Sequence, residues 1–584
     1  MSGICGFVGR ADPAVIGRML EAIDYRGDRT DMAQADGVAL GYRWWAGRPG
    51  KSPGIHREGA HLVACAGTFA PPVPSPASAL KDRFRSGGGG LDNLDGAFAG
   101  AWWDGEQRCL KLLRDPFGVR SLYYVEHRGV FYFASELKQL LAIPELPVAV
   151  DAVALHKYLT FSFVPGEQTP VKGVRRLLAG RWAQLQDGHL AITPYFTLRE
   201  EIDARFNDRR VAVREIRQHC HEAVHRRLNG EAEVALFLSG GIDSSGVAVW
   251  LRDSGVKVRP FSLDFGERSV EKEQAQAVAQ RLQLPLTFLP VGGAEIARIL
   301  TDLVWKLDLP FGDPVTGPQY LLGRAAREAG LTAVFNGEGG DQLFGGWTSK
   351  PMISAEIYAD LYGEESREEM YLRSYHRFYG LEDQLYTDPF RAEVGGPGQR
   401  RAYLQSFLRS NDASTFLNRV RLADISLKGT KNILPRAERM TNGWGLDLRV
   451  PLFDRALAEA SFRLPPQMKL RGACEKYLLK LILQKHLPRE IVWRRKFGMS
   501  VPITDWALGP LAPALEDLLG PESLNRRGFF RNEYVGRLRR GQNDSNETRR
   551  RRLGERLWTL AMLEAWLRVF IDGRGKRPGA TPEA

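Results

Sequence analysis

The pattern of apolar and polar positions changes near residue 200. Over residues 1–195, apolar runs of strand length alternate with glycine and proline, which predicts strands joined by turns. These runs lie at residues 61–65, 97–103 and 129–134. Residues 71–90 are rich in proline, serine, alanine and glycine, and we expect a loop there.

The second part of the chain has a helical pattern that is interrupted by short apolar strands. The strands are predicted at residues 234–238, 258–263 and 332–335. Because strands that alternate with helices form parallel sheets, we expect an α/β domain. From residue 352 onward nearly every segment is predicted to be helical, including an amphipathic helix over residues 553–570. Residues 573–584 are expected to be a disordered tail.

Length and composition predict a soluble protein of several domains. A chain of 584 residues exceeds the usual size of one domain. No apolar run reaches the roughly 18 residues that a membrane span requires, and the N-terminus lacks the basic and apolar regions of a secretory signal. The five cysteines are widely scattered, which argues against a disulfide framework or a zinc cluster. We therefore expect a cytoplasmic protein with no membrane partner.

The net charge of +12 has two interpretations. It could indicate a nucleic-acid partner, or a basic surface with pockets for anionic phosphates, which we favour. The densest basic run, Arg549-Arg550-Arg551-Arg552, leads into the last predicted helix. We interpret this run as a solvated helix face and expect no nucleic-acid partner.

The strongest chemical signal is the loop Ser239-Gly240-Gly241-Ile242-Asp243-Ser244-Ser245, between an apolar strand and a helical run. Its glycines permit a tight turn and the close approach of a ligand. The helix start offers free N–H groups to a phosphate, and the serines add hydroxyl donors. The loop has no lysine, so it is not the phosphate loop that ends in Gly-Lys-Ser/Thr. It resembles the loop with which ATP pyrophosphatases hold the departing pyrophosphate; the alternative is an ordinary glycine turn.

A second glycine-rich segment, Asn336-Gly337-Glu338-Gly339-Gly340-Asp341-Gln342-Leu343-Phe344-Gly345-Gly346, also follows a predicted strand. Acidic residues within such a turn suit Mg²⁺, which prefers carboxylate and phosphate oxygens. Asp243 and Asp341 both follow strand ends, and ligands bind at that edge of an open α/β sheet. We therefore predict that this pair binds the metal; the alternative is a turn with solvated acids.

These loops and further motifs resemble the asparagine synthetase family, from the N-terminus to about Arg568. The further matching motifs are Arg114-Asp115-Pro116-Phe117-Gly118-Val119-Arg120, Phe133-Ala134-Ser135-Glu136, Arg439-Met440, Gly445-Leu446-Asp447-Leu448-Arg449-Val450-Pro451-Leu452-Phe453-Asp454, Glu475-Lys476-Tyr477 and Arg495-Lys496-Phe497-Gly498. The resemblance implies an α+β glutaminase-like domain of the Ntn-hydrolase type, with layered antiparallel sheets, over residues 1–195. It implies an α/β ATP-pyrophosphatase domain, with a parallel sheet and many helices, over residues 205–572.

The resemblance also implies roles for single residues. The adenine and ribose site would be lined by Leu238, Leu263, Asn336 and Gly337. The phosphates would be held by Ser239, Gly240, Gly241, Asp243, Ser244 and Ser245. Asp243 and Asp341 would bind Mg²⁺, and Lys476 would neutralise charge as a carboxylate oxygen attacks the α-phosphate of ATP. Glu338 would orient the carboxylate substrate or the attacking amine.

The first domain departs from the family where glutamine would be hydrolysed. An active glutaminase of this family has Cys directly after Met, whereas this chain has Ser2, and Cys5 comes three residues too late. The family's Asn-Gly-Glu reads Ala66-Gly67-Thr68, its His-Arg-Gly-Pro-Asp reads Tyr25-Arg26-Gly27-Asp28-Arg29, and its Ser-Asp-Thr segment is deleted near residues 87–91. The loss of hydrogen-bond partners for glutamine weakens recognition. We expect a folded but catalytically silent glutaminase domain.

The expected function is therefore an ATP-dependent amide ligase that forms AMP and pyrophosphate. It would adenylate aspartate or a related acid and transfer ammonia or an amine to it. The main alternative is a specialised amide-bond former that resembles β-lactam or macrolactam synthetases and uses an amine of its substrate. An ATP pyrophosphatase that acts on tRNA and a non-catalytic partner protein are further alternatives, which the late motifs and the intact ATP loops disfavour. The assembly state stays open, with a homodimer as one alternative.

Overall fold

The computed structural model describes most of the chain. The described residues are 2–35, 37–46, 54–85, 90–346, 352, 366–375, 377–395, 398–494, 501–541 and 547–579. The motif at residues 495–498 lies outside them, and so do the side chains of Arg549, Arg550 and Arg551.

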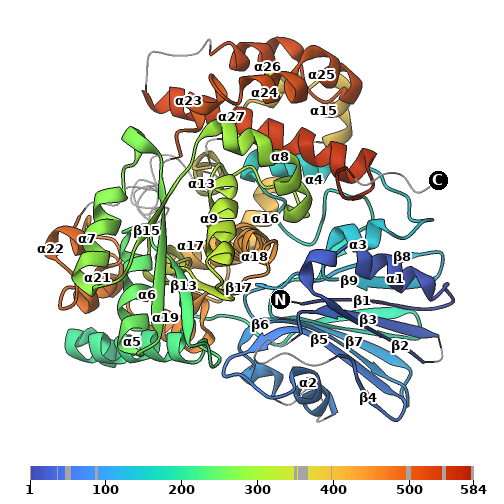
Figure 1. Cartoon of the computed structure of the whole chain (residues 1–584), viewed down its shortest axis with the longest axis horizontal. Coiled ribbons are helices and arrows are strands. Elements are labelled where there is room, and N and C mark those ends of the chain that lie inside the picture. Colours follow the sequence, from blue (N-terminus) through green and yellow to red (C-terminus); the bar gives the residue numbers. More distant parts are fainter. Residues whose placement is uncertain are drawn as a thin grey trace.

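The N-terminal domain consists of two six-stranded antiparallel sheets, which lie one above the other in Figure 1. One sheet has the order β10(Arg175–Arg176), β8(Tyr123–His127), β9(Val130–Ala134), β1(Ser2–Val8), β3(Val38–Trp44), β2(Arg29–Ala35). The other has the order β12(His189–Pro194), β11(Arg181–Gln186), β7(Cys109–Arg114), β6(Gly96–Asp104), β5(His61–Phe69), β4(His56–Glu58). The predicted layered antiparallel sheets are confirmed. The α-helices among the described residues of this domain are α1(Ala14–Glu21), α2(Pro76–Arg85), α3(Leu137–Leu141) and α4(Ala152–Phe161).

The prediction of a loop over residues 71–90 is wrong for its centre, where α2 forms. Ala77, Leu80 and Phe84 lie at helical spacing and are buried against β5 and β6. Proline is tolerated in the first turn of a helix because the N–H it lacks has no partner there anyway. The proline- and serine-rich composition of the segment therefore concealed a short amphipathic pattern.

The C-terminal domain is built on a five-stranded parallel sheet. Its order is β15(Thr287–Pro290), β14(Lys257–Asp264), β13(Glu233–Phe237), β16(Ala333–Phe335), β17(Asp447–Arg449). All four strand pairs are parallel, so the predicted α/β fold class is confirmed. The sequence did not predict β15 or β17. Both are short edge strands, and the pairing of β17 with β16 depends on contacts far along the chain.

Many helices surround this sheet and extend beyond it. The helices α6(Ile242–Asp253), α7(Lys272–Leu282), α9(Thr316–Glu328) and α18(Leu434–Asn442) contact its strands most. The same domain contains α5(Arg209–His225), α8(Gly293–Leu307), α10(Gly340–Phe344), α19(Arg455–Arg463) and α21(Tyr477–Leu483). The others are α13(Ser366–Arg373), α14(Glu382–Leu385), α15(Asp388–Val394), α16(Gly398–Leu408), α17(Phe416–Asp424), α20(Pro466–Lys469), α22(Arg489–Val492), α23(Ile503–Ala507), α24(Ala512–Leu519), α25(Pro521–Arg527), α26(Asn532–Arg539) and α27(Glu547–Trp566), with π-helical turns over Ile425–Ile433 and Leu567–Asp572. Within the described chain, no helix combines the length and apolarity that a bilayer span needs.

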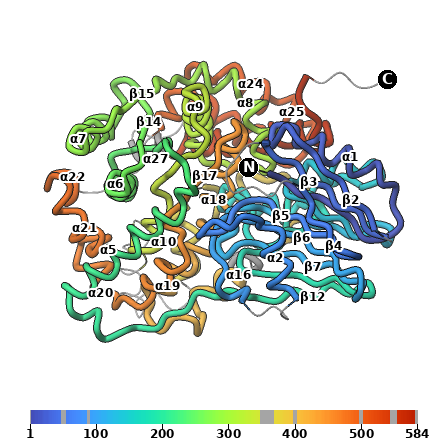
Figure 2. The backbone as a smooth tube through the Cα atoms, turned by 60° about the horizontal axis from the view of Figure 1, so that its bottom comes forward, coloured from blue at the N-terminus to red at the C-terminus, as the bar shows by residue number. Residues whose placement is uncertain are grey.

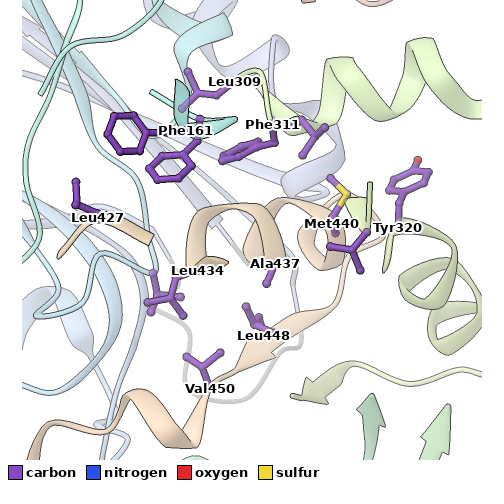
Figure 3. Packing of buried hydrophobic residues seen from close by; sticks show 14 of the residues in the cluster. Phe161, Leu309, Phe311, Tyr320, Leu427, Leu434, Ala437, Met440, Leu448 and Val450 are labelled. Atoms are coloured by element: carbon purple, nitrogen blue, oxygen red, sulfur yellow. The ribbon is translucent and has the colours of Figure 1, made fainter. Parts of the chain in front are cut away.

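One hydrophobic core runs through both domains. It extends from Cys5 and Phe7 in β1 to Trp566 and Phe570 at the C-terminal helix. Figure 3 shows its middle, where the apolar side chains of α18 pack between neighbouring elements. The labelled residues there include Phe161, Phe311, Leu434, Ala437, Met440, Leu448 and Val450. Because α18 contributes to this shared core, it is fixed relative to both domains.

The segment predicted as a tail begins in contact with the N-terminal domain. The Arg574 guanidinium donates to the carbonyl oxygens of Ile143 and Leu146 at 3.1 and 3.0 Å. The Trp305 indole N–H donates to the Gly575 carbonyl oxygen at 3.0 Å. These hydrogen bonds do not fit disorder from residue 573 onward, and residues 580–584 lie outside the described chain.

Candidate active site

Two glycine-rich loops meet at the carboxyl edge of the parallel sheet. β13 and β16 are neighbours, with Leu236 paired to Phe335, so the segments that follow them emerge side by side. The strand β14 also ends at this edge of the sheet, where its Phe261 carbonyl oxygen accepts the Leu238 N–H at 2.9 Å. The predicted placement of both loops at one sheet edge is therefore observed.

The first loop closes on itself through its serines. The Ser239 and Ser244 hydroxyl oxygens lie 3.1 Å apart, and the Gly241 N–H donates to the Ser239 hydroxyl at 3.2 Å. Gly240 adopts a φ of +72°, and a Cβ there would lie 2.5 Å from the Ala275 nitrogen, so a side chain would be excluded. α6 then begins with no side-chain cap, which leaves N–H groups at its start available to an anion.

The glycines of the second loop let it approach the first without collision. A Cβ on Gly337 would collide with the backbone of Ser244, and one on Gly340 would collide with the Asp243 carboxylate. A Cβ on Gly346 would collide with the Asp341 carboxylate. Gly337 and Gly340 are therefore required by the tight packing of the two loops, and Gly346 by the packing of the second loop on itself.

Lys476 lies between the two predicted metal-binding acids. Its Nζ atom forms an ion pair with Asp243 and lies 2.8 Å from Asp341 Oδ1. The lysine side chain is 1% exposed, whereas those of Asp243 and Asp341 are 20% and 30% exposed. Burial alone would lower the pKa of Lys476, but the two carboxylates outweigh this and raise it above its ordinary value. The site therefore keeps one buried positive charge beside two carboxylates.

A cavity of about 300 Å³ opens beside these groups. The predicted site residues that line it are Leu238, Ser239, Gly241, Asp243, Ser244, Leu263, Asn336, Gly337, Glu338 and Lys476. Three predicted residues do not line the cavity. Ser245 is fully buried behind the loop, Gly240 presents its carbonyl oxygen to Arg494 at 3.2 Å, and Asp341 faces Lys476.

The cavity also has lining residues that the sequence did not single out. They are Phe237, Ile242, Phe261, Ser262, Phe265, Ser269, Val270, Glu271, Lys272, Gln319, Leu322, Glu475, Lys480, Ile491, Val492 and Arg494. The Arg494 guanidinium also lies 3.2 Å from Glu271, so it joins the loop after β13 to the segment before α7. A weak signal existed, because Arg494 directly precedes the motif at residues 495–498.

Glu338 lies at the edge of the cavity, in a chain of charged side chains. Arg436 on α18 forms an ion pair with Asp313, and its NH2 group lies 3.7 Å from Glu338 Oε1. Burial raises the pKa of Glu338 above its ordinary value, while Arg436 opposes this rise and Asp313 adds to it. Arg436 itself is 4% exposed. The sequence did not predict this cluster, because its members come from three separate segments.

Ser2 lies inside the N-terminal domain, in register opposite Trp44 of β3. The residue is 1% exposed, and its hydroxyl accepts the Gly67 N–H at 3.1 Å. Arg26 donates to the Ser2 carbonyl oxygen at 3.3 Å and forms ion pairs with Glu136 and Glu438. The residues predicted to form a degenerate glutaminase site are therefore adjacent, and their polar groups contact one another or other protein groups.

Comparison with known proteins agrees with this geometry. The family model described as asparagine synthase matches residues 215–568, which is more than half of the chain, and a glutamine amidotransferase domain model matches residues 80–196. A glutamine-hydrolyzing asparagine synthetase of Bacillus subtilis is 24% identical over 507 residues, covering 82% of this chain and 78% of its own length. A putative asparagine synthetase of Mycobacterium tuberculosis is 28% identical over 515 residues, with the same coverage of 82% and 78%. A Penicillium rubens protein named amidase chyE is 26% identical over 506 residues, covering 75% of this chain and 74% of its own. The chain belongs to the asparagine synthase family.

Proposed function

We propose that the protein is an amide ligase that transfers AMP from ATP to aspartate or a related small acid and then joins ammonia or an amine to the acyl group. The observation that carries this proposal is the position of Lys476 between Asp243 and Asp341, beside the cavity where two glycine-rich loops meet. A cation held there is suited to the charge that develops when the α-phosphate is attacked.

The cavity offers separate surroundings to the parts of ATP. The apolar and amide groups of Leu238, Leu263 and Asn336 would contact adenine and ribose, next to the Gly337 backbone. The free N–H groups at the start of α6 and the Ser239 and Ser244 hydroxyls would hold the phosphates. Gly240 and Ser245 would support the shape of this loop.

Asp243 and Asp341 have the donor chemistry for Mg²⁺, because they are two neighbouring carboxylates at a phosphate-binding edge. When bound, Mg²⁺ would supply positive charge to the leaving pyrophosphate. Lys476 keeps the two carboxylates close together and compensates part of their repulsion.

The reaction would then follow from the positions of these groups. A carboxylate oxygen of the acid attacks the α-phosphorus of ATP, the bond to the bridging oxygen breaks, and pyrophosphate leaves. Lys476 stabilises the added negative charge at the α-phosphate. The amine next attacks the acyl carbon and AMP leaves with the electron pair. Glu338, which lines the cavity and whose pKa is raised by burial, accepts the proton of the amine.

We infer that the nitrogen does not come from glutamine. Ser2 is a weaker nucleophile than cysteine, and its hydroxyl is 1% exposed and bound to Gly67. Arg26 contacts Glu136 and Glu438, and Thr68 accepts a hydrogen bond from Arg449 at 3.0 Å. The groups at these positions already have protein partners, which supports free ammonia or a substrate amine as the donor.

The alternative is a specialised ligase in natural-product synthesis, which closes or joins an amide with an amine of its own substrate. The degenerate first domain is the observation that favours it, because an enzyme with a substrate amine has no need of glutamine. For either function we propose a cytoplasmic location, since the five cysteines, all within the described residues, form no disulfide bond.

The experiment that tests the proposal is ATP–pyrophosphate exchange with purified protein and a panel of carboxylic acids, aspartate first. Exchange that depends on one acid supports adenylation and names the acid. Mass spectrometry of the product with labelled ammonia, and with no added amine, then separates the two alternatives. Absence of exchange with every acid, together with ADP formation, would reject the proposal.

A further inference from the structure

α18 presents charged side chains to both domains. Arg436 extends toward the active site, where it contacts Asp313 and Glu338. Glu438 and Arg439 follow two and three positions later and contact residues of the N-terminal domain instead. Successive residues of a helix point about 100° apart, so one turn of α18 connects the two environments.

Glu438 is held by two arginines of the N-terminal domain. Arg26 contacts both of its carboxylate oxygens, at 2.9 and 3.3 Å. Arg120 donates to Glu438 Oε1 at 2.6 Å and to Asp447 Oδ1 of β17 at 2.8 Å. The guanidinium of Arg120 therefore joins α18 to the edge strand of the parallel sheet. Figures 1 and 2 both place the start of β1, near Arg26, at the boundary between the domains.

Arg439 makes the second connection between α18 and the first domain. It lies 3.3 Å from Glu136 and donates to the Ser135 carbonyl oxygen at 3.1 Å. Asp308 of the C-terminal domain accepts the N–H groups of Leu137 and Lys138 at the start of α3, at 2.7 and 3.0 Å. All these charged groups are buried, so their positions are strongly coupled.

The opposite side of α18 leaves little room for movement. Gly323 of α9 packs against it so closely that a Cβ there would lie 2.9 Å from the Met440 carbonyl oxygen. A displacement of α18 would therefore move Arg436 relative to Glu338.

We propose that the glutaminase-like domain acts as a scaffold that positions the synthetase site. Arg26 and Arg120 are positioning residues: through Glu438 they fix α18, which holds Arg436 against Glu338. This role rests on the proposed ligase function, because Glu338 is assigned to the amine step. This role explains why the N-terminal domain, in which Ser2 is buried and Arg26 is ion-paired with Glu438, shares a continuous hydrophobic core with the C-terminal domain.

The test separates the adenylation step from the amide-forming step in the full chain. In Arg26→Met and in Arg120→Met, we expect amide formation with ammonia to fall by about 10-fold or more, since a small misplacement near the reacting atoms is costly. Acid-dependent ATP–pyrophosphate exchange should stay within about 3-fold of the wild type, because the ion pairs that Lys476 forms with Asp243 and Asp341 include no residue of α18. Arg26→Lys, which keeps the charge, should recover part of the lost rate.

The control is Arg10→Met, the same substitution at an exposed position of the same domain, which should leave both rates unchanged. Glu438→Gln provides a milder variant if Arg26→Met fails to fold, and the same division between the two rates is expected. Equal losses in both steps, or full amide formation in all folded variants, would overturn the inference. No exchange by the wild type would instead reject the proposed function.

Discussion

The Lys476 ammonium lies 2.8 Å from the Asp341 carboxylate, although Asp341 belongs to α10 and Lys476 lies just before α21. Lys476 precedes α21 and has a φ of +53°, an unusual conformation for a residue with a side chain. This backbone places a buried cation at the mouth of the cavity. Strained backbone of this kind is concentrated at functional sites.

Lys476→Ala should reduce turnover by roughly 100-fold or more, because one preplaced cation in a dry site stabilises the transition state by about 3 kcal/mol. ATP binding should stay near normal, since the lysine acts on charge that develops during the reaction. Rates and ATP titrations measure the two effects. Lys485→Ala, at an exposed position nine residues further along the chain, is the control and should behave as the wild type. A loss confined to ATP affinity would contradict the assigned role.

Asp243→Ala should abolish pyrophosphate release that depends on the acid substrate. The substitution removes a carboxylate from the proposed Mg²⁺ site and leaves Lys476 with one ion-pair partner. A titration of activity against Mg²⁺ measures the effect directly. The matched control is Asp253→Ala at the other end of α6, where the carboxylate contacts Arg252 at the surface. Full activity of the Asp243 variant at ordinary Mg²⁺ would remove the metal role.

Gly337→Ala should weaken ATP binding and destabilise the C-terminal domain. The added methyl group would collide with the Ser244 backbone and push the two loops apart. Overpacking of this kind typically costs about 1–3 kcal/mol. Gly292→Ala is the control, since a Cβ there meets no atom within 4 Å and stability should change by at most about 0.5 kcal/mol. Thermal melting with and without ATP checks both variants, and equal behaviour would argue against the tight loop contact.

The ion pairs of Glu438 predict a loss of stability in acid. Burial alone would raise its pKa, but Arg26, Arg439 and Arg120 outweigh this and lower the pKa from 4.5 to about 2. A group whose pKa is lower in the folded state than in the unfolded state stabilises the fold at pH values above its unfolded-state pKa. This contribution is lost as the pH falls through the folded-state pKa. The free energy of unfolding of the wild type should therefore approach that of Glu438→Gln between about pH 4.5 and pH 2. Denaturant unfolding at several pH values measures the difference, and a difference independent of pH would contradict the assignment.

Glutamine should not replace ammonia as nitrogen donor, and no glutamate should accumulate. We also expect Ser2→Cys alone to restore little glutaminase activity, because Arg26 stays paired with Glu136 and Glu438. An assay for glutamate in the presence of ATP and the acid substrate tests both statements. Efficient glutamate release by the wild type would show that the buried serine is an active nucleophile.

The sequence predicted the features that depend on local chemistry. The two glycine-rich loops and the strands before them were found, because short apolar runs followed by glycine are local signals. α2 was missed because composition outweighed a short helical pattern. β17 was missed because a three-residue strand is defined by its pairing with β16 and hardly by its own residues.

The polar clusters between segments were beyond prediction from one sequence. Arg436 and Asp313 are 123 positions apart, and Arg26 and Glu438 are 412 positions apart. Charged residues at such separations give no periodic or spacing signal. The assignment of Ser245 to the phosphates stays a prediction from its motif position, and the structure places this residue in the interior.

The most direct test of the account is the identity of the nucleotide product when purified protein turns over ATP with its acid substrate. Phosphorus NMR of the reaction distinguishes the two ways of cleaving ATP. The account predicts AMP and pyrophosphate in equal amounts, with formation dependent on Lys476. ADP and inorganic phosphate as the products would contradict it.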